Sequence, residues 1–85
     1  MLGRDLLTPH AALGRALRSL RLSVGLSQEQ LGLESGVQRN FISLIETGQN
    51  QPTIGTIFKL AYALKIKPSK LVAEAEHLAD FAPKT

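Results

Sequence analysis

The chain has 85 residues, of which 44% are apolar and 20% charged, and its formal net charge is +3. This length allows one domain with a modest core, and the apolar fraction excludes a disordered tail. The absence of cysteine excludes disulfides and thiolate metal sites and suits a reducing compartment. No apolar run is long enough to span a membrane, and the N-terminus lacks the apolar core of a signal peptide. We therefore expect a cytoplasmic protein.

A first helix is predicted to begin at Thr8-Pro9, because threonine caps helices and proline is favoured at the first helical position. Residues 1–8 show no clear period and are expected to form an N-terminal arm. Apolar residues then recur at spacings of three and four along one face, at Leu13, Ala16, Leu17, Leu20 and Val24. Gly25 should end this helix in a left-handed conformation.

Two independent signals place the start of a second helix just after Ser27. Ser27 and Gln30 have the spacing of a capping box, and Leu26 and Leu31 have that of a hydrophobic staple. The helix should end at Gly36. Leu31, together with Leu33 or Ser35, is expected to face inward or sideways.

A third helix is predicted from about Gln38 to Thr47, with Gly48 as its stop. Its start is less well marked, because glutamine is a poor helix cap. Two short amphipathic helices joined by a tight turn, with polar residues opening the second, form a helix-turn-helix.

Two more helices follow the polar loop at residues 49–52. Thr53 caps the fourth helix, and a wide apolar stripe is expected to pack in the core: Ile54, Ile57, Phe58, Ala61 and Leu64. The fifth helix begins at Pro68, has apolar residues at helical spacing, and can continue as far as Phe81. Five helices without a strand candidate predict an all-α fold.

Positive charge is concentrated in the middle of the chain. Residues 35–73 carry five basic residues and one acid, Glu46, whereas residues 74–85 carry one basic residue and three acids. A basic surface attracts polyanions such as nucleic acid. Because a charge of this size is common on soluble domains, the pattern alone favours nucleic acid only slightly.

Residues 17–71 resemble the lambda-repressor-like, Cro/XRE-type helix-turn-helix domains of bacteria and their phages. Four spaced features carry the resemblance: Leu-Ser-Gln at residues 26–28, Gly-Val at 36–37, Ile-Ser-x-Ile-Glu-x-Gly at 42–48, and Pro-Thr at 52–53. The resemblance implies a compact five-helix DNA-binding domain over residues 9–72, with the helix-turn-helix at helices two and three. A C-terminal helical extension and tail would then occupy residues 73–85.

In such domains the third helix lies in the major groove, which places Gln38, Arg39 and Asn40 at base edges. Arginine can bridge guanine O6 and N7, and asparagine or glutamine can bridge adenine N6 and N7. One turn later, Ser43 and Leu44 should face the groove or its wall. A polar first turn is by itself most often only solvated, but within this motif we favour contact with DNA.

The resemblance also implies residues that bind the DNA backbone. Gln28 would hold a phosphate with its side chain and its backbone N–H at the positive end of the second helix, with Ser27 beside it. The remaining candidates for phosphate contacts are Phe41, Thr47, Gln49, Asn50 and Gln51. For the loop at residues 49–51, a plain turn is an equally weighted alternative.

Arg21 and Glu46 are expected to serve structure first. The family commonly joins an arginine of the first helix to the glutamate of the third by a salt bridge. Glu46 is the only acid in the basic region, so it would repel phosphates if it were left unpaired.

No enzymatic constellation is present. His10 and His77 lie far apart and lack partners at metal-ligand spacing, so neither catalysis nor a metal or other cofactor is expected. The predicted function is a sequence-specific, repressor-like transcriptional regulator that binds double-stranded DNA. Because one recognition helix reads only a few base pairs, we expect a homodimer on a palindromic operator.

The dimer interface would lie on the fifth helix or on the edge of the fourth near Tyr62 and Ile66, although packing in the core is the favoured role for the fourth. The alternative function is an antitoxin or a restriction-modification controller subunit. In that case residues 73–85 would bind a protein partner.

Overall fold

The computed structural model describes residues 7–79, and within this range the chain forms five helices and no strand. The helices are α1 (Pro9–Ser23), α2 (Gln28–Ser35), α3 (Arg39–Glu46), α4 (Ile54–Ala63) and α5 (Pro68–Leu78). The predicted all-α fold is therefore confirmed. None of these helices combines the length and apolar character that crossing a membrane would need.

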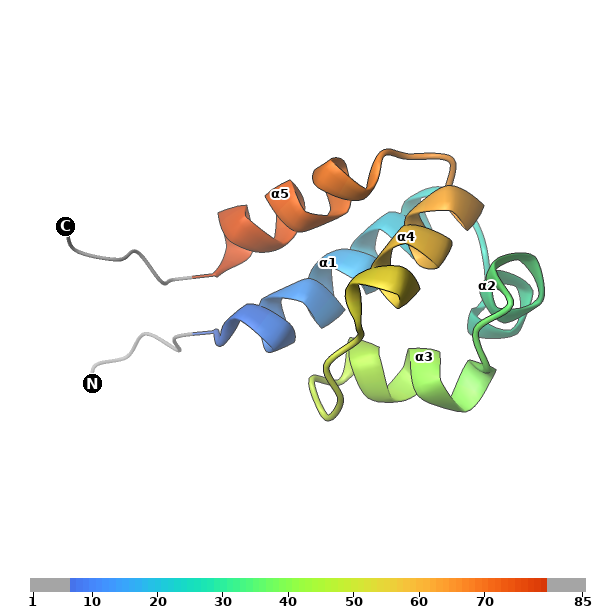
Figure 1. Ribbon diagram of the computed structural model, residues 1–85, viewed down its shortest axis with the longest axis horizontal. Coiled ribbons are helices and arrows are strands. Elements are labelled where there is room, and N and C mark those ends of the chain that lie inside the picture. The colour runs from blue at the N-terminus through green and yellow to red at the C-terminus, as the bar shows by residue number, and fades with distance from the viewer. Residues whose placement is uncertain (1–6, 80–85) are drawn as a thin grey trace, which may run out of the picture.

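The longest helix, α1, organises the domain (Figure 1). It packs against α5 along one side and against α3 along another, while α2 contacts α3 and α4, and α4 contacts α5. In Figure 1, α1 begins and α5 ends at the same side of the domain, and α2 and α3 form the opposite, lower corner. The helix-turn-helix is thus held on a scaffold of three helices.

A single core joins all five helices. The six largest side chains that are less than 2% exposed come from all five helices: Leu17, Leu31, Ile42, Ile45, Leu60 and Leu71. Burying a side chain of this size contributes roughly 1.5–3 kcal/mol. Because no helix could bury its apolar face alone, the five helices depend on one another.

The helix starts predicted from the sequence are confirmed in detail. The Thr8 and Thr53 hydroxyls accept hydrogen bonds from backbone N–H groups of the helices they precede. The Ser27 Oγ accepts from the Gln30 N–H at 3.0 Å, and the Gln30 side chain accepts from the Ser27 N–H at 2.8 Å. At Gln38, by contrast, no side-chain cap is made. Because a helix cap involves residues within one turn of each other, these helix starts could be predicted from the sequence.

The prediction for α4 is wrong at two of its five apolar positions. Ile57, Ala61 and Leu64 are buried, but Ile54 is 67% and Phe58 55% exposed. The reason is that α2 and α5 cover only one side of α4. An apolar stripe therefore remains on the surface.

The fifth helix ends earlier than its longest predicted extent. It stops at Leu78, with Ala79 as its extended C-terminal residue, and Phe81 lies outside the described residues. Leu71 and Ala75 are buried, whereas Val72 is 46% exposed. Residues 73–78 thus continue the same helix that begins at Pro68.

Candidate nucleic-acid interface

The turn between α2 and α3 is fixed by backbone geometry and by one buried side chain. Gly36 takes a φ of 77°, a conformation that side chains disfavour, and its N–H donates to the Gly32 carbonyl at 2.9 Å. Val37 then enters the core. The extended Gln38 carbonyl accepts from the N–H groups of Phe41 and Ile42, at 2.9 and 3.0 Å, and so begins α3.

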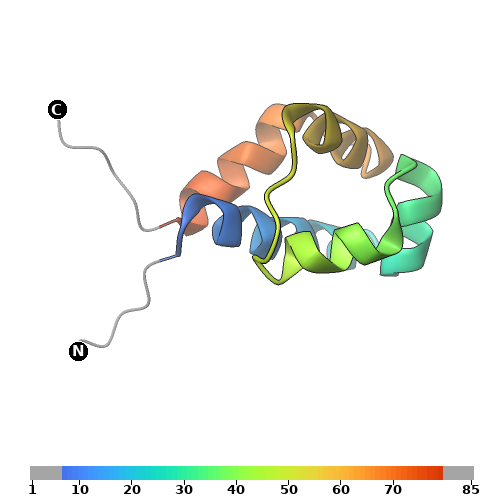
Figure 2. The same cartoon turned by 60° about the horizontal axis from the view of Figure 1, so that its bottom comes forward.

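The polar first turn of α3 faces outward. Gln38, Arg39 and Asn40 are exposed, whereas Ile42 and Ile45 on the opposite face are fully buried. In Figure 2, α3 runs along the front of the molecule with no other helix covering it. Ser43 and Leu44, one turn further on, are half-buried. The five residues predicted to read bases thus lie on one uncovered helix or, for Gln38, at its N-cap, and the buried face of this helix sets its orientation.

Two apolar side chains near this turn differ in their surroundings. Phe41 is half-buried and packs against the core, so only part of its ring is accessible. Ser35, the predicted alternative to Leu33 on the inner side of α2, is half-buried, whereas Leu33 is 80% exposed. It lines a shallow hollow that also includes Gln38 and Arg39. The sequence could not decide between Leu33 and Ser35, because α2 is too short to establish a reliable period.

The N-terminus of α2 presents backbone donors beside Gln28. The capping box occupies the Ser27 hydroxyl and the Gln30 N–H, and the Leu31 N–H donates to the Ser27 carbonyl at 3.0 Å. The first N–H groups of a helix have no intrahelical acceptor. Those of Gln28 and Glu29 therefore remain available to an anion at this end of the helix.

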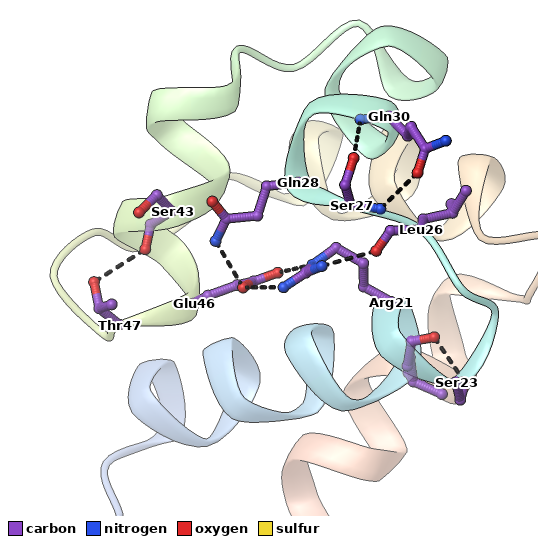
Figure 3. A network of polar contacts seen from close by, with 10 residues as sticks. Arg21, Ser23, Leu26, Ser27, Gln28, Gln30, Ser43, Glu46 and Thr47 are labelled. Atoms are coloured by element: carbon purple, nitrogen blue, oxygen red, sulfur yellow. Dashed lines mark hydrogen bonds and ion pairs between the residues drawn. The ribbon is translucent and has the colours of Figure 1, made fainter.

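A network of charged and polar groups ties α1, α2 and α3 together (Figure 3). The Arg21 Nε donates to the Glu46 Oε2 at 2.7 Å, and Nη2 donates to Oε1 at 3.0 Å. The remaining guanidinium nitrogen, Nη1, donates to the Leu26 carbonyl at 2.8 Å. The Gln28 Nε2 completes the network by donating to the Glu46 Oε1 at 3.0 Å. The expected Arg21–Glu46 pair is therefore present.

This network is buried and fully satisfied. The side chains of Arg21 and Glu46 are only 8% and 2% exposed, and no buried side-chain polar atom in the described part of the chain lacks a partner. A two-bonded pair between arginine and a carboxylate fixes geometry as well as charge. The bond from Gln28 to Glu46 was not predicted, because the two residues are 18 positions apart and meet only through the tertiary fold.

The polar segment after α3 is largely bonded to itself. The Thr47 hydroxyl lies 3.0 Å from the Ser43 carbonyl and accepts from the Gln49 side chain at 2.9 Å. The backbone N–H groups of Gln49 and Asn50 both donate to the Leu44 carbonyl. The Gln51 side chain lies 3.4 Å from the His10 ring nitrogen Nδ1. These bonds give the segment a defined shape, with Gln49 and Gln51 exposed and Asn50 half-buried.

Comparison with known proteins identifies the family. The helix-turn-helix family HTH_3 matches residues 17–71. An uncharacterized HTH-type transcriptional regulator of Sinorhizobium fredii is 33% identical over 63 residues, which are 74% of this chain and 82% of that protein. The control protein C.BamHI of Bacillus amyloliquefaciens is 37% identical over 60 residues, covering 69% of this chain and 74% of that one.

A solved structure agrees with these matches. The restriction-modification controller protein C.AhdI of Aeromonas hydrophila has a TM-score of 0.70 and 43% identity, over 72% of this chain and 92% of its own. The family match covers α2, α3 and α4 completely, together with the part of α1 that contains Arg21. The chain therefore belongs to the HTH_3 family of Cro/C1-type helix-turn-helix proteins, whose members include transcriptional regulators.

Proposed function

We propose that this protein is a sequence-specific, DNA-binding transcriptional regulator of the repressor type that reads a palindromic operator as a homodimer. The observation that carries the proposal is the uncovered polar first turn of α3, set on a helix whose other face is fully buried. A rigid recognition helix with exposed arginine and amide side chains suits the major groove. Acting on bacterial DNA would place the protein in the cytoplasm.

Base reading is assigned to the exposed side of α3. Arg39 is the residue best suited to guanine, and Gln38 and Asn40 are suited to adenine. Ser43 and Leu44 would form the groove-facing wall one turn later, with Leu44 suited to a thymine methyl group. The missing side-chain cap at Gln38 supports a recognition role, since its amide is not committed to the helix.

Phosphate binding is assigned to the N-terminus of α2 and to the segment after α3. Glu46 accepts one hydrogen of the Gln28 amide, which orients the side chain and leaves its second hydrogen and the backbone N–H for a phosphate. The Ser27 hydroxyl and N–H are occupied in the capping box, so Ser27 would contribute by holding the start of α2 in place beside the phosphate. Phe41 would touch the backbone with its exposed edge. On the other side, the polar segment supplies Thr47, Gln49, Asn50 and Gln51.

Selection of bound duplexes from a random pool tests this function. The expected product is a palindrome whose half-sites are about 10 base pairs apart, because a two-fold dimer places its recognition helices one turn of DNA apart. Affinity should fall steeply as salt rises, because phosphate contacts release counterions. Absence of salt-dependent affinity for any duplex would refute the proposal.

Replacing Arg39 with alanine should selectively remove sequence preference. Losing a bidentate base contact costs about 1–3 kcal/mol, or roughly 5- to 150-fold in affinity for the selected site, while weak binding to unrelated duplexes should remain. Competition binding with selected and scrambled duplexes measures this difference. Gln28→Ala is the matched comparison and should weaken both duplexes equally, because phosphates carry no sequence information. An unchanged preference in Arg39→Ala would remove Arg39 from the reading set.

A second candidate function is a restriction-modification controller. Two relatives support it, since C.AhdI and C.BamHI are both described as controllers.

The antitoxin alternative requires a protein partner at residues 73–85. Within this segment, residues 73–78 belong to α5, where Ala75 is buried and Ala73, Glu76 and His77 are exposed. A partner would therefore bind the outer side of α5, and a pull-down in which the variant Glu76→Arg fails to capture it would distinguish this role.

A further inference from the structure

The outer face of α4 carries an exposed apolar stripe with no partner in the described part of the chain. Ile54, Phe58 and Tyr62 are spaced four residues apart, and they are 67%, 55% and 85% exposed. Residues at this spacing lie above one another on one side of a helix. In Figure 1, α4 lies at the front of the domain, and no other helix passes in front of it. Three large apolar side chains in one row mark an interaction surface.

We propose that this stripe is the surface through which two copies of the chain associate, a step that rests on the proposed function. The stripe is symmetric about Phe58, with one large apolar residue four positions before it and one four positions after. Antiparallel packing of two α4 helices about a two-fold axis would place Phe58 against its own copy. Ile54 of each copy would then meet Tyr62 of the other. Such a self-complementary patch is what a two-fold interface requires.

The size of the stripe fits a dimer. A standard interface buries about 800 Å² per partner, of which roughly 450–500 Å² is apolar. At their observed exposures, the three side chains offer roughly 300–400 Å² of that amount. Gly55 lies beside the stripe, and a Cβ there would meet nothing nearer than the Thr53 hydroxyl at 3.8 Å. A second helix can therefore approach closely, with the stripe forming most of the apolar centre of the interface.

The charges around the stripe also favour this arrangement. Lys59 is the only charged residue of α4, and it lies about 100° around the helix from Phe58. Its charge would therefore stay at the solvated rim of the interface, where a like charge costs little. Tyr62 combines an apolar ring with a hydroxyl that can reach water at the edge, as tyrosines in interfaces do. The two-fold axis that relates the two α4 helices would also relate the two recognition helices, and a palindrome has the same two-fold symmetry.

Sedimentation equilibrium of the full chain tests the interface. The wild type should be a dimer at micromolar concentration, and Phe58→Glu should weaken dimerisation by at least about 100-fold, as expected for a residue at the centre of an interface. Tyr62→Lys is a second variant that leaves the core intact, because the Tyr62 side chain is 85% exposed. Leu22→Glu is the control, because Leu22 is similarly exposed at 53% but lies on α1. A monomeric wild type, or a Phe58→Glu variant that remains dimeric, would overturn the proposal.

Cysteine cross-linking tests the antiparallel arrangement, since the chain has no cysteine of its own. Mixing Ile54→Cys with Tyr62→Cys under mild oxidation should give mainly the mixed disulfide, because disulfides form only across short Cα distances. Cross-linking of each variant chiefly to itself would refute the arrangement. The DNA-binding function fails separately: a dimer that binds no duplex would refute that function and leave the interface standing. A monomer that binds a half-site would refute the interface and the dimeric mode of binding, and would leave DNA binding itself standing.

Discussion

Replacing Arg21 with alanine should lower the free energy of unfolding by about 3–5 kcal/mol, because the Glu46 carboxylate would be left buried without its cation. The Glu46 side chain is 2% exposed, and Arg21 donates two of the hydrogen bonds that it accepts. After the substitution only the Gln28 amide would remain as a donor. The Leu26 carbonyl would also lose the guanidinium N–H that it accepts. Urea unfolding followed by circular dichroism measures the change.

The double variant Arg21→Met/Glu46→Leu separates the cost of a broken pair from the contribution of the intact pair. Replacing a buried ion pair by apolar residues of similar volume is often neutral or stabilising, so this variant should recover most of the lost stability. Its affinity for DNA should still be reduced, because Gln28 would lose the acceptor that orients it toward phosphate. Equal stability losses in the single and double variants would contradict this account of the network.

The extent to which the sequence predicted the fold depended on how local each signal was. The caps at Thr8, Ser27 and Thr53 depend on residues within one turn, and all three are present. Burial on α4 depends on which helices pack against it, and the apolar pattern alone could not show that Ile54 and Phe58 stay at the surface. A wide apolar stripe that packs wholly in the core has the same sequence pattern as one that packs only partly in the core and leaves the rest at the surface.

The candidate site shows the same division. The exposed first turn of α3 followed from the position of the turn at Gly36, and Glu46 was expected to pair with Arg21 from the family resemblance. The bond between Gln28 and Glu46 was not expected, because it needs α2 and α3 at a fixed angle. That angle is set by buried residues of both helices, Leu31 and Ile45 among them. The base and phosphate contacts themselves remain predictions, which the binding experiments above address.

Gly14→Ala should strongly destabilise the protein, because α1 approaches the end of α3 closely at this residue. A Cβ at Gly14 would clash with the Ile45 carbonyl oxygen and lie 3.1 Å from the Glu46 carbonyl carbon. These are backbone atoms, which cannot rotate away as a flexible side chain could. The two helices would have to separate where Arg21 and Glu46 join them, and both Ile45 and the ion pair would lose contacts.

The sign of this effect is set by that contact and not by helix propensity. Alanine is favoured over glycine within a helix by about 1 kcal/mol, but overpacking a core costs about 1–3 kcal/mol and more where backbone must move. We therefore expect the free energy of unfolding to fall by about 2 kcal/mol or more, measured by urea unfolding. Ser19→Ala is the control, because Ser19 is exposed on the same helix and alanine there adds propensity without a new contact. If Gly14→Ala proved as stable as that control, α1 would not lie this close to α3, and the contact proposed to orient the recognition helix would be absent.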